Sequence, residues 1–201
     1  MAAVALLVFG LYLLMAFGVR GAQQYRRTGD FGFRGVSGRP GSLEWWGGAL
    51  FALALVLGLA APILVMTDMA APLGTLDHPA VRVAGVVLAA AGTTGTLAAQ
   101  HSMGASWRVG VDRSEATRLV TTGAFAWARN PVFTAMITAG LGIALLAPNL
   151  VALTGLAALT AAIEIQVRAV EEPYLLTSHG RTYRDYAART GRFLPGLGRL
   201  T

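Results

Sequence analysis

The 201-residue sequence contains no cysteine and no lysine, and these two absences exclude several kinds of site. Without cysteine there is no disulfide framework, iron–sulfur cluster, thiolate zinc site or cysteine nucleophile. Without lysine there is neither a Schiff-base nucleophile nor a Walker-type phosphate loop. Charge is also scarce, because 13% of the residues are charged and 55% are hydrophobic. That balance argues against disorder and against an ordinary water-soluble domain.

Five apolar stretches account for the hydrophobic excess. They comprise residues 2–19, 45–66, 79–99, 131–146 and 150–167. A helix needs about 20 residues to cross the hydrocarbon core, so the second and third stretches are long enough and the others approach that length. The break at Ala147-Pro148-Asn149 predicts that the last two form a tight helical hairpin, with a buried soluble core as the alternative for this pair. We predict an all-α, polytopic integral membrane protein with about five transmembrane helices and a cytoplasmic C-terminal helical segment.

The arginines indicate the topology. All 16 basic residues are arginine, against 10 acidic residues, which gives a net charge of +6. All of them except Arg82 lie in segments that a five-helix arrangement places on one side of the membrane, namely residues 20–44, 102–130 and 168–201. The positive-inside rule makes that side cytoplasmic and places the N-terminus outside. Topology and anionic lipid therefore explain the charge, and no nucleic acid partner is predicted.

The two halves of the chain differ in character. Residues 1–100 are expected to form three N-terminal transmembrane helices, with a basic cytoplasmic loop at residues 20–44. The first stretch resembles a secretory signal only weakly, since its arginines follow the apolar run. The small residues at 89–95 are typical of close helix packing. Residues 101–201 hold most of the polar side chains, so we expect the catalytic half there, with the transmembrane hairpin and cytoplasmic cofactor-binding segments.

Ionisable residues at helical spacing end the fifth stretch: Glu164, Arg168, Glu171 and Glu172. On an α-helix they share one face, and ionisable groups at membrane depth indicate function by default. A juxtamembrane ladder of ion pairs is the alternative. Tyr183 and Tyr186 follow in an amphipathic stretch, either as part of a site or as anchors at the membrane interface.

A second polar block, Arg129-Asn130-Pro131, precedes the fourth stretch. Pro131 suits the first turn of a helix, and Asn130 suits the N-cap, where its side-chain oxygen accepts hydrogen bonds from backbone amides. The helix N-terminus and Arg129 together would attract an anion such as a carboxylate or phosphate.

These blocks resemble the isoprenylcysteine carboxyl methyltransferase family, which is related to the phospholipid methyltransferases. The resemblance covers residues 100–195 and rests on Gly123 with Arg129-Asn130-Pro131-Val132-Phe133, then Arg168-x-x-Glu171-Glu172-x-x-Leu175, then Gly180-x-x-Tyr183-x-x-Tyr186. Asn130 stands where the family usually has histidine, and Phe133 where it has tyrosine. The resemblance implies a multi-helix membrane enzyme that binds S-adenosylmethionine on the cytoplasmic side through its C-terminal half.

By this resemblance, Arg129 and the helix start at Asn130 would hold the carboxylate of S-adenosylmethionine. Glu171 or Glu172 would hold its amino group or ribose hydroxyls, and the two tyrosines would supply aromatic surface. The expected cofactor-binding residues are Gly123, Arg129, Asn130, Pro131, Phe133, Glu171, Glu172, Tyr183 and Tyr186.

The methyl acceptor would be lipophilic and would arrive from the bilayer. A carboxylate acceptor needs only a cationic holder, for which Arg168 is the candidate, whereas an amine or thiol needs a base such as Glu164 or Glu172. The candidate catalytic residues are Arg168, Glu164 and Arg129, and the candidate substrate-binding residues are Trp107, Arg108 and Arg168. Trp107 could instead be an interfacial anchor. The three scattered histidines predict no metal site.

The leading hypothesis is methyl transfer to a lipophilic acceptor, with a carboxylate as one acceptor class. One alternative is S- or N-methylation of a small thiol, an amine or a phospholipid headgroup. Another is a non-catalytic membrane protein that retains the fold, and cofactor binding separates it from both enzymes. A membrane reductase or isomerase is disfavoured because the sequence has no dinucleotide glycine motif and no convincing pair of haem ligands. A transporter is disfavoured because no inverted repeat is visible.

Overall fold

The computed structural model describes residues 1–33, 35, 36, 38–110 and 119–200. These residues are mostly helical, and β structure among them is limited to two isolated bridges. In chain order the helices are α1 (Ala2–Leu13), the π-helical η1 (Leu14–Val19), α2 (Arg20–Thr28), α3 (Leu43–Met66), α4 (Pro79–Met103), the short η2 (Gly104–Ser106) and η3 (Gly123–Ala126), α5 (Pro131–Leu146), α6 (Leu150–Ile165), the π-helical η4 (Gln166–Glu171) and α7 (Glu172–Arg189). The predicted all-α fold is confirmed.

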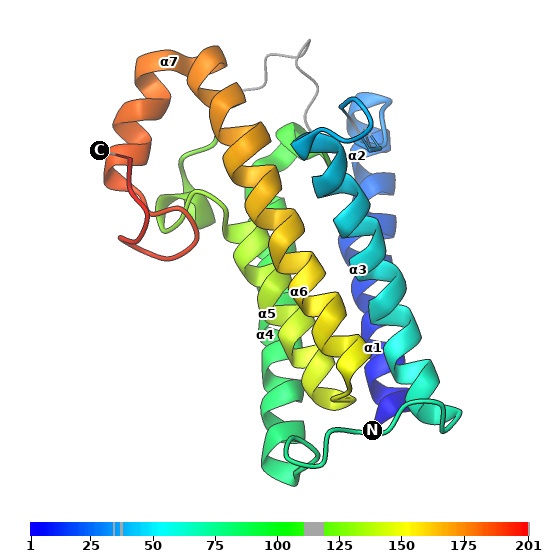
Figure 1. Cartoon of the computed structure of the whole chain (residues 1–201). Helices are drawn as coiled ribbons and strands as arrows, with labels where there is room; N and C mark the ends of the chain where they lie inside the picture. The colour runs from blue at the N-terminus through cyan, green and yellow to red at the C-terminus, as the bar shows by residue number, and fades with distance from the viewer. Residues whose placement is uncertain (34, 37, 111–118, 201) are drawn as a thin grey trace.

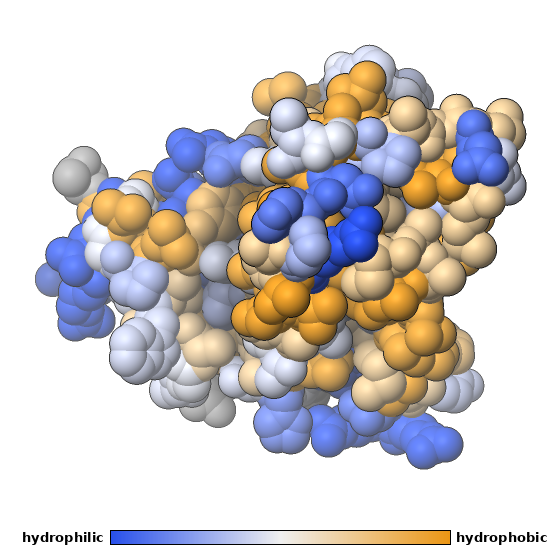
Figure 2. All heavy atoms as spheres, turned by 90° about the horizontal axis from the view of Figure 1, so that it is seen from below, coloured by the Kyte–Doolittle hydropathy of each residue, from blue (hydrophilic) through white to orange (hydrophobic). Residues whose placement is uncertain are grey.

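The long helices stand side by side, and α1 and α6 each continue through a π-helical segment into the next helix (Figure 1). Among the described residues, four helices are long and apolar enough to cross a membrane: Ala2–Thr28, Leu43–Met66, Pro79–Met103 and Leu150–Arg189. The α5 helix is apolar and shorter. Large apolar side chains are exposed along the bundle, and Figure 2 shows them beside hydrophilic patches when the molecule is seen from below. The prediction of a polytopic integral membrane protein is confirmed.

The two ends of the bundle differ in charge. The N-terminus lies at the lower end of Figure 1, whereas α2 and α7 lie at the upper end. At the start of α4, Arg82 pairs with Asp77 at 2.7 Å, so the one arginine outside the basic segments is neutralised locally. Arg34, Arg113 and Arg118 lie outside the described residues. Placing the upper end in the cytoplasm stays a prediction from the arginine distribution.

The first helix extends further than the sequence suggested. Residues 20–28 were expected to begin a loop, but they form α2, and the loop prediction is wrong for this stretch. The helix ends where Gly29 adopts a left-handed conformation, with φ of 73°, and its N–H bonds the carbonyl of Tyr25 at 2.8 Å. Arg20 is buried here, with its guanidinium 4.9 Å from the centre of the Trp107 ring.

Glycines bring α4 and α5 into backbone contact. A Cβ atom at Gly92 would collide with the backbone of Ala139, and one at Gly142 would collide with the backbone of Ala89. Close approach of this kind is how membrane helices gain packing energy in the absence of a hydrophobic driving force. The run of small residues at 89–95 therefore serves helix packing.

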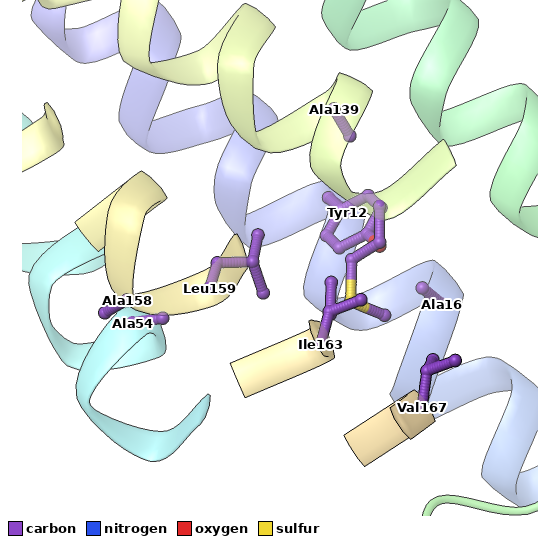
Figure 3. Packing of buried hydrophobic residues seen from close by; sticks show 9 residues of the cluster. Tyr12, Ala16, Ala54, Ala139, Ala158, Leu159, Ile163 and Val167 are labelled. Carbon is purple, nitrogen blue, oxygen red and sulfur yellow. The ribbon is translucent and has the colours of Figure 1, made fainter. Parts of the chain in front are cut away.

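Small and medium-sized side chains fill the space between the helices. Figure 3 shows one cluster, in which Tyr12 of α1 lies near Ala139 of α5 and Ile163 of α6. The buried members are Tyr12, Ala16, Ala54, Met136, Ala139, Ala158, Leu159, Ile163 and Val167. Four separate helices contribute to this cluster, so it fixes the frame on which the polar end of the molecule is built.

The glycine contact between α4 and α5 can be tested by adding one methyl group. We expect Gly92→Ala to lower the free energy of unfolding by about 1–3 kcal/mol, because the helices must separate to admit the methyl group. Gly10→Ala is the matched control, since no atom lies within 4 Å of a Cβ at that position. Unfolding midpoints in mixed detergent micelles would measure both, and equal midpoints for the two variants would contradict this account of the packing.

Candidate active site

Glu172 is buried between two arginines at the upper end of the bundle. Its Oε1 accepts hydrogen bonds from Nη2 of Arg129 at 2.6 Å and from Nε of Arg192 at 2.7 Å. Its Oε2 accepts one from Nη2 of Arg192 at 3.0 Å. The bond to this carboxylate is the main reason that the pKa of Arg192 is raised above its usual value. The three side chains form a charged cluster withdrawn from water.

Arg129 also binds the chain end that follows α7. Its Nη1 donates to the carbonyls of Ala187 at 3.0 Å and Thr190 at 2.7 Å, and its Nη2 donates to Gly198 at 3.2 Å. The Nε atom of Arg129 is buried and has no hydrogen-bond partner. The other N–H groups of this guanidinium hold the protein together.

The segment after α7 returns to the start of α5. The backbone N–H groups of Arg129 and Asn130 bond the carbonyls of Gly191 at 2.8 Å and Arg192 at 3.0 Å. Gly191 has no space for a side chain, because a Cβ there would collide with the carbonyl oxygens of Leu194 and Leu197. This fold-back brings Arg192 to Glu172.

The π-helical segment η4 separates the ionisable residues that the sequence suggested would share one face. Hydrogen bonds in a π-helix join residues five apart, so η4 changes the direction in which the following side chains point. Gln166 donates to Glu171, five residues on, at 3.3 Å. Arg168 pairs instead with Glu164, and these two side chains are 57% and 38% exposed. The predicted shared face is confirmed for Glu164 and Arg168, which pair at helical spacing, and is wrong for Glu172, which is buried in the charged cluster.

Two tyrosines pack beneath the charged cluster. Tyr183 and Tyr186 are buried, with ring centres 6.2 Å apart in an edge-on arrangement. The hydroxyl of Tyr186 donates to the carbonyl of Phe125 at 2.6 Å, which ties α7 to the segment before α5. Because both rings are buried, they are not anchors at the membrane interface.

A cavity of about 660 Å³ joins these groups to the membrane helices. Its polar end is formed by the charged cluster and the tyrosines, and its apolar walls come from α3 and α5, including Phe51, Leu55 and Met136. Most predicted site residues line it: Trp107, Arg108, Arg129, Asn130, Phe133, Glu171, Glu172, Tyr183 and Tyr186. The volume lies within the range of small-molecule sites, about 300–1,000 Å³.

Four predicted site residues lie elsewhere. Glu164 and Arg168 pair with each other and are not part of the cavity wall. Gly123 begins η3 with φ of 61°, a turn conformation that favours glycine. A Cβ there would lie 2.9 Å from the Ser102 hydroxyl, so Gly123 serves the turn. Pro131 occupies the first turn of α5, as predicted.

Asn130 occupies the predicted N-cap position of α5, but it does not make the predicted capping hydrogen bond. Its side chain makes no cap hydrogen bond, and its Nδ2 instead donates to the carbonyl of Arg192 at 3.0 Å. The returning chain competes for this amide, which is why the local rule fails here. Trp107, which the sequence left as a possible interfacial anchor, is buried in the cavity wall beneath Arg20.

Sequence reasoning missed several polar residues of the site. Arg192, Gln166, Gln100 and His179 all lie beside the predicted residues or in the same cavity wall. Arg192 could have been suspected from the block Gly191-Arg192 before Pro195. Gln100 is buried in α4, a helix long and apolar enough to cross a membrane, where a polar side chain is itself a signal.

Comparison with known proteins gives one family. A family model described as phospholipid methyltransferase matches residues 80–182, which includes α4, α5, α6, η4 and the first part of α7. A comparison with curated proteins gives no match.

The charged cluster can be tested by making the same substitution at Glu172, which lies in the cluster, and at Glu164 of α6, which does not. We expect Glu172→Gln to lower the free energy of unfolding by about 3–5 kcal/mol, because it leaves Arg129 buried without its counter-ion. Glu164→Gln should lower it by less than about 1 kcal/mol, since that ion pair is exposed. Unfolding in mixed detergent micelles would measure both, and equal losses would show that Glu172 is not the structural centre of the cluster.

Proposed function

The chain belongs to the phospholipid methyltransferase family, and on that premise we propose that it uses S-adenosylmethionine to methylate a lipophilic acceptor within the membrane. It is an integral membrane methyltransferase by family and by its apolar helices. One observation carries the finer proposal. A single cavity joins a charged end, at Arg129 and Glu172, to apolar walls supplied by membrane-spanning helices.

The residues at the charged end fit the chemistry of S-adenosylmethionine. The buried Nε of Arg129 is a cationic donor without a partner, and it suits the carboxylate of the amino acid end. Glu171 lines the cavity and accepts one long bond from Gln166, so its carboxylate suits the amino group or the ribose hydroxyls. Tyr183 and Tyr186 offer aromatic surface for the remainder. When bound, S-adenosylmethionine supplies a methyl group on a cationic sulfur.

The apolar part of the cavity suits a hydrocarbon chain. A second, smaller cavity of about 60 Å³ lies deeper among α1, α3, α5 and α6, and it shares Phe17, Phe51 and Met136 with the larger one. Small residues such as Gly58 and Ala61 line its inner end. A tail that entered from the bilayer would lie among these side chains and leave its polar head toward Trp107 and Arg108.

The protein's contribution to the rate would be positioning and the exclusion of water. Arg129 would orient one reactant from the charged end, while the apolar walls would orient the other from the membrane. Glu164 and Arg168 have no role in this proposal, because they lie outside the cavity wall. Gly123 and Pro131 would act by shaping the backbone that carries Arg129.

Binding of the product S-adenosylhomocysteine to the protein in nanodiscs, measured by calorimetry, tests the proposal. We expect binding by the wild type and a dissociation constant raised about tenfold or more by Glu171→Gln, because a hydrogen bond to a charged group is lost. The same measurement on Tyr183→Phe tests whether the Tyr183 hydroxyl contributes to binding. Glu164→Gln is the control, since this carboxylate lies outside the cavity wall. Absence of binding by folded wild type would favour a non-catalytic membrane protein.

A further inference from the structure

Three large apolar side chains are exposed outside the helices that could cross a membrane. Trp127, directly after η3, is 72% exposed, and Leu194 and Leu197, in the segment that folds back after α7, are 51% and 63% exposed. The isolated bridge between Ala128 and Gly191 brings these two stretches side by side. We call Trp127, Leu194 and Leu197 the lateral patch.

The lateral patch lies level with the upper end of α4. The start of η3 packs there, because a Cβ at Gly123 would lie 2.9 Å from the hydroxyl of Ser102, close to the last residue of α4. Since α4 is long and apolar enough to cross a membrane, its end marks the depth at which hydrocarbon gives way to headgroups. In Figure 1 the fold-back segment (red) hangs beside the bundle, below the top of α7.

The chemistry of the patch suits that depth. Tryptophan is enriched at membrane interfaces, where its ring meets acyl chains and its N–H meets water or headgroups. The two leucines flank a tight turn, in which the N–H of Leu197 bonds the carbonyl of Leu194 at 3.2 Å. The carbonyl of Leu197 in turn accepts a bond from the N–H of Arg192 at 2.7 Å. Because these backbone groups are paired within the segment, the turn can enter an apolar layer at low cost.

The chain around the patch is basic. Residues 181–200, the C-terminal lobe, contain five arginines and a single acidic residue, Asp185. Arg192 is bound to Glu172, whereas four arginines are exposed: Arg181, Arg184, Arg189 and Arg199. Asp185 offsets little of this charge, since its distance to Arg181 is 3.9 Å and both side chains are exposed. Figure 2 shows hydrophobic and hydrophilic spheres side by side on this lobe, at the left.

We propose that the lateral patch seats the C-terminal lobe in the interface of an anionic bilayer. The two leucines lie among the upper parts of the acyl chains, Trp127 lies at the headgroup boundary, and the exposed arginines lie beside anionic headgroups. This proposal does not depend on which molecule the cavity binds. The segment that carries both leucines also brings Arg192 to Glu172, so the bilayer and the charged cluster hold the same stretch of chain in place.

Tryptophan fluorescence tests the position of the patch. The chain has 4 tryptophans, so the emission difference between wild type and Trp127→Phe isolates Trp127. The nanodiscs contain phosphatidylcholine with a minor share of phosphatidylglycerol, and bromine near the top of the acyl chains quenches indole on contact. We expect brominated phosphatidylcholine to remove most of this emission difference. A difference that the brominated lipid leaves unchanged would place the patch outside the bilayer and overturn the proposal.

The leucines can be tested with the same readout. Leu194→Ser combined with Leu197→Ser should weaken the quenching of Trp127, because the lobe loses its apolar contact with the acyl chains. Leu150→Ser is the matched control, since this leucine is 70% exposed at the start of α6, at the opposite end of the bundle. Quenching that is unchanged in the double variant would show that the leucines do not seat the lobe.

Moving the bromine to the phosphatidylglycerol tests the charge. An arginine close to an anionic surface favours binding to it by a factor of about five, so brominated phosphatidylglycerol should quench Trp127 several-fold more than an equal share of brominated phosphatidylcholine. Arg184→Gln, Arg189→Gln and Arg199→Gln together should remove this excess. Arg82→Gln, at the start of α4 where the arginine pairs with Asp77, should retain it. Equal quenching of wild type by the two brominated lipids would overturn the assignment to an anionic surface.

Discussion

The carboxylate of Glu172 is withdrawn from water between two guanidinium groups, and three separate stretches of chain meet around it. Arg129 comes from the start of α5, Glu172 from the start of α7, and Arg192 from the segment that folds back after α7. Buried charge is costly unless oppositely charged partners and further hydrogen bonds compensate it. The backbone pairing of residues 129 and 130 with residues 191 and 192 holds Arg192 beside Glu172, so the charges and the fold-back require each other.

Both long interrupted helices place a buried ionisable residue directly after a π-helical segment. Arg20 follows η1 and lies over Trp107, and Glu172 follows η4 and binds Arg129. Single turns of π-helix often occur at functional sites, because they redirect the side chains that follow. Gln100 reinforces the first of them, since its Nε2 donates to the carbonyl of Ala16 within η1 at 2.9 Å. The two segments together turn polar groups inward at one end of an otherwise apolar bundle.

The sequence predicts those features of the fold that depend on neighbouring residues, and it does not predict those that depend on contacts between distant segments. Apolar length and the Ala147-Pro148-Asn149 break predict α5 with its observed bounds, Pro131–Leu146, and the hairpin that Asn149 caps through Ala152 at 3.0 Å. The run at 89–95 predicts close packing, although the partner helix is visible only in space. From Gln166 onward, the α-helical spacing of 3.6 residues per turn no longer predicts which side chains share a face, because the chain there forms a π-helix.

The candidate site was predicted only in part for a related reason. Motif blocks identify Arg129, Glu172 and the tyrosines, which do line one cavity. The cap expected of Asn130 fails because a segment about 60 residues away competes for its amide. No local pattern in the sequence indicates that Arg192 meets Glu172, since that contact depends on the fold-back at Gly191.

Three buried side-chain atoms without a hydrogen-bond partner belong to residues that line the large cavity, and two more belong to Arg20, which does not line it. The Oε1 of Gln100, the Nε of Arg129 and the Nε2 of His179 all lack partners, and all three residues line the same cavity. Each such atom costs about 1–3 kcal/mol when no partner reaches it. Bound molecules can supply the missing hydrogen bonds in a cavity wall, so these three atoms indicate where a ligand would place polar groups. Gln100 lies near the end of α4 and Arg129 lies in the charged cluster, so a ligand that completed both would carry polar groups at two places in the cavity.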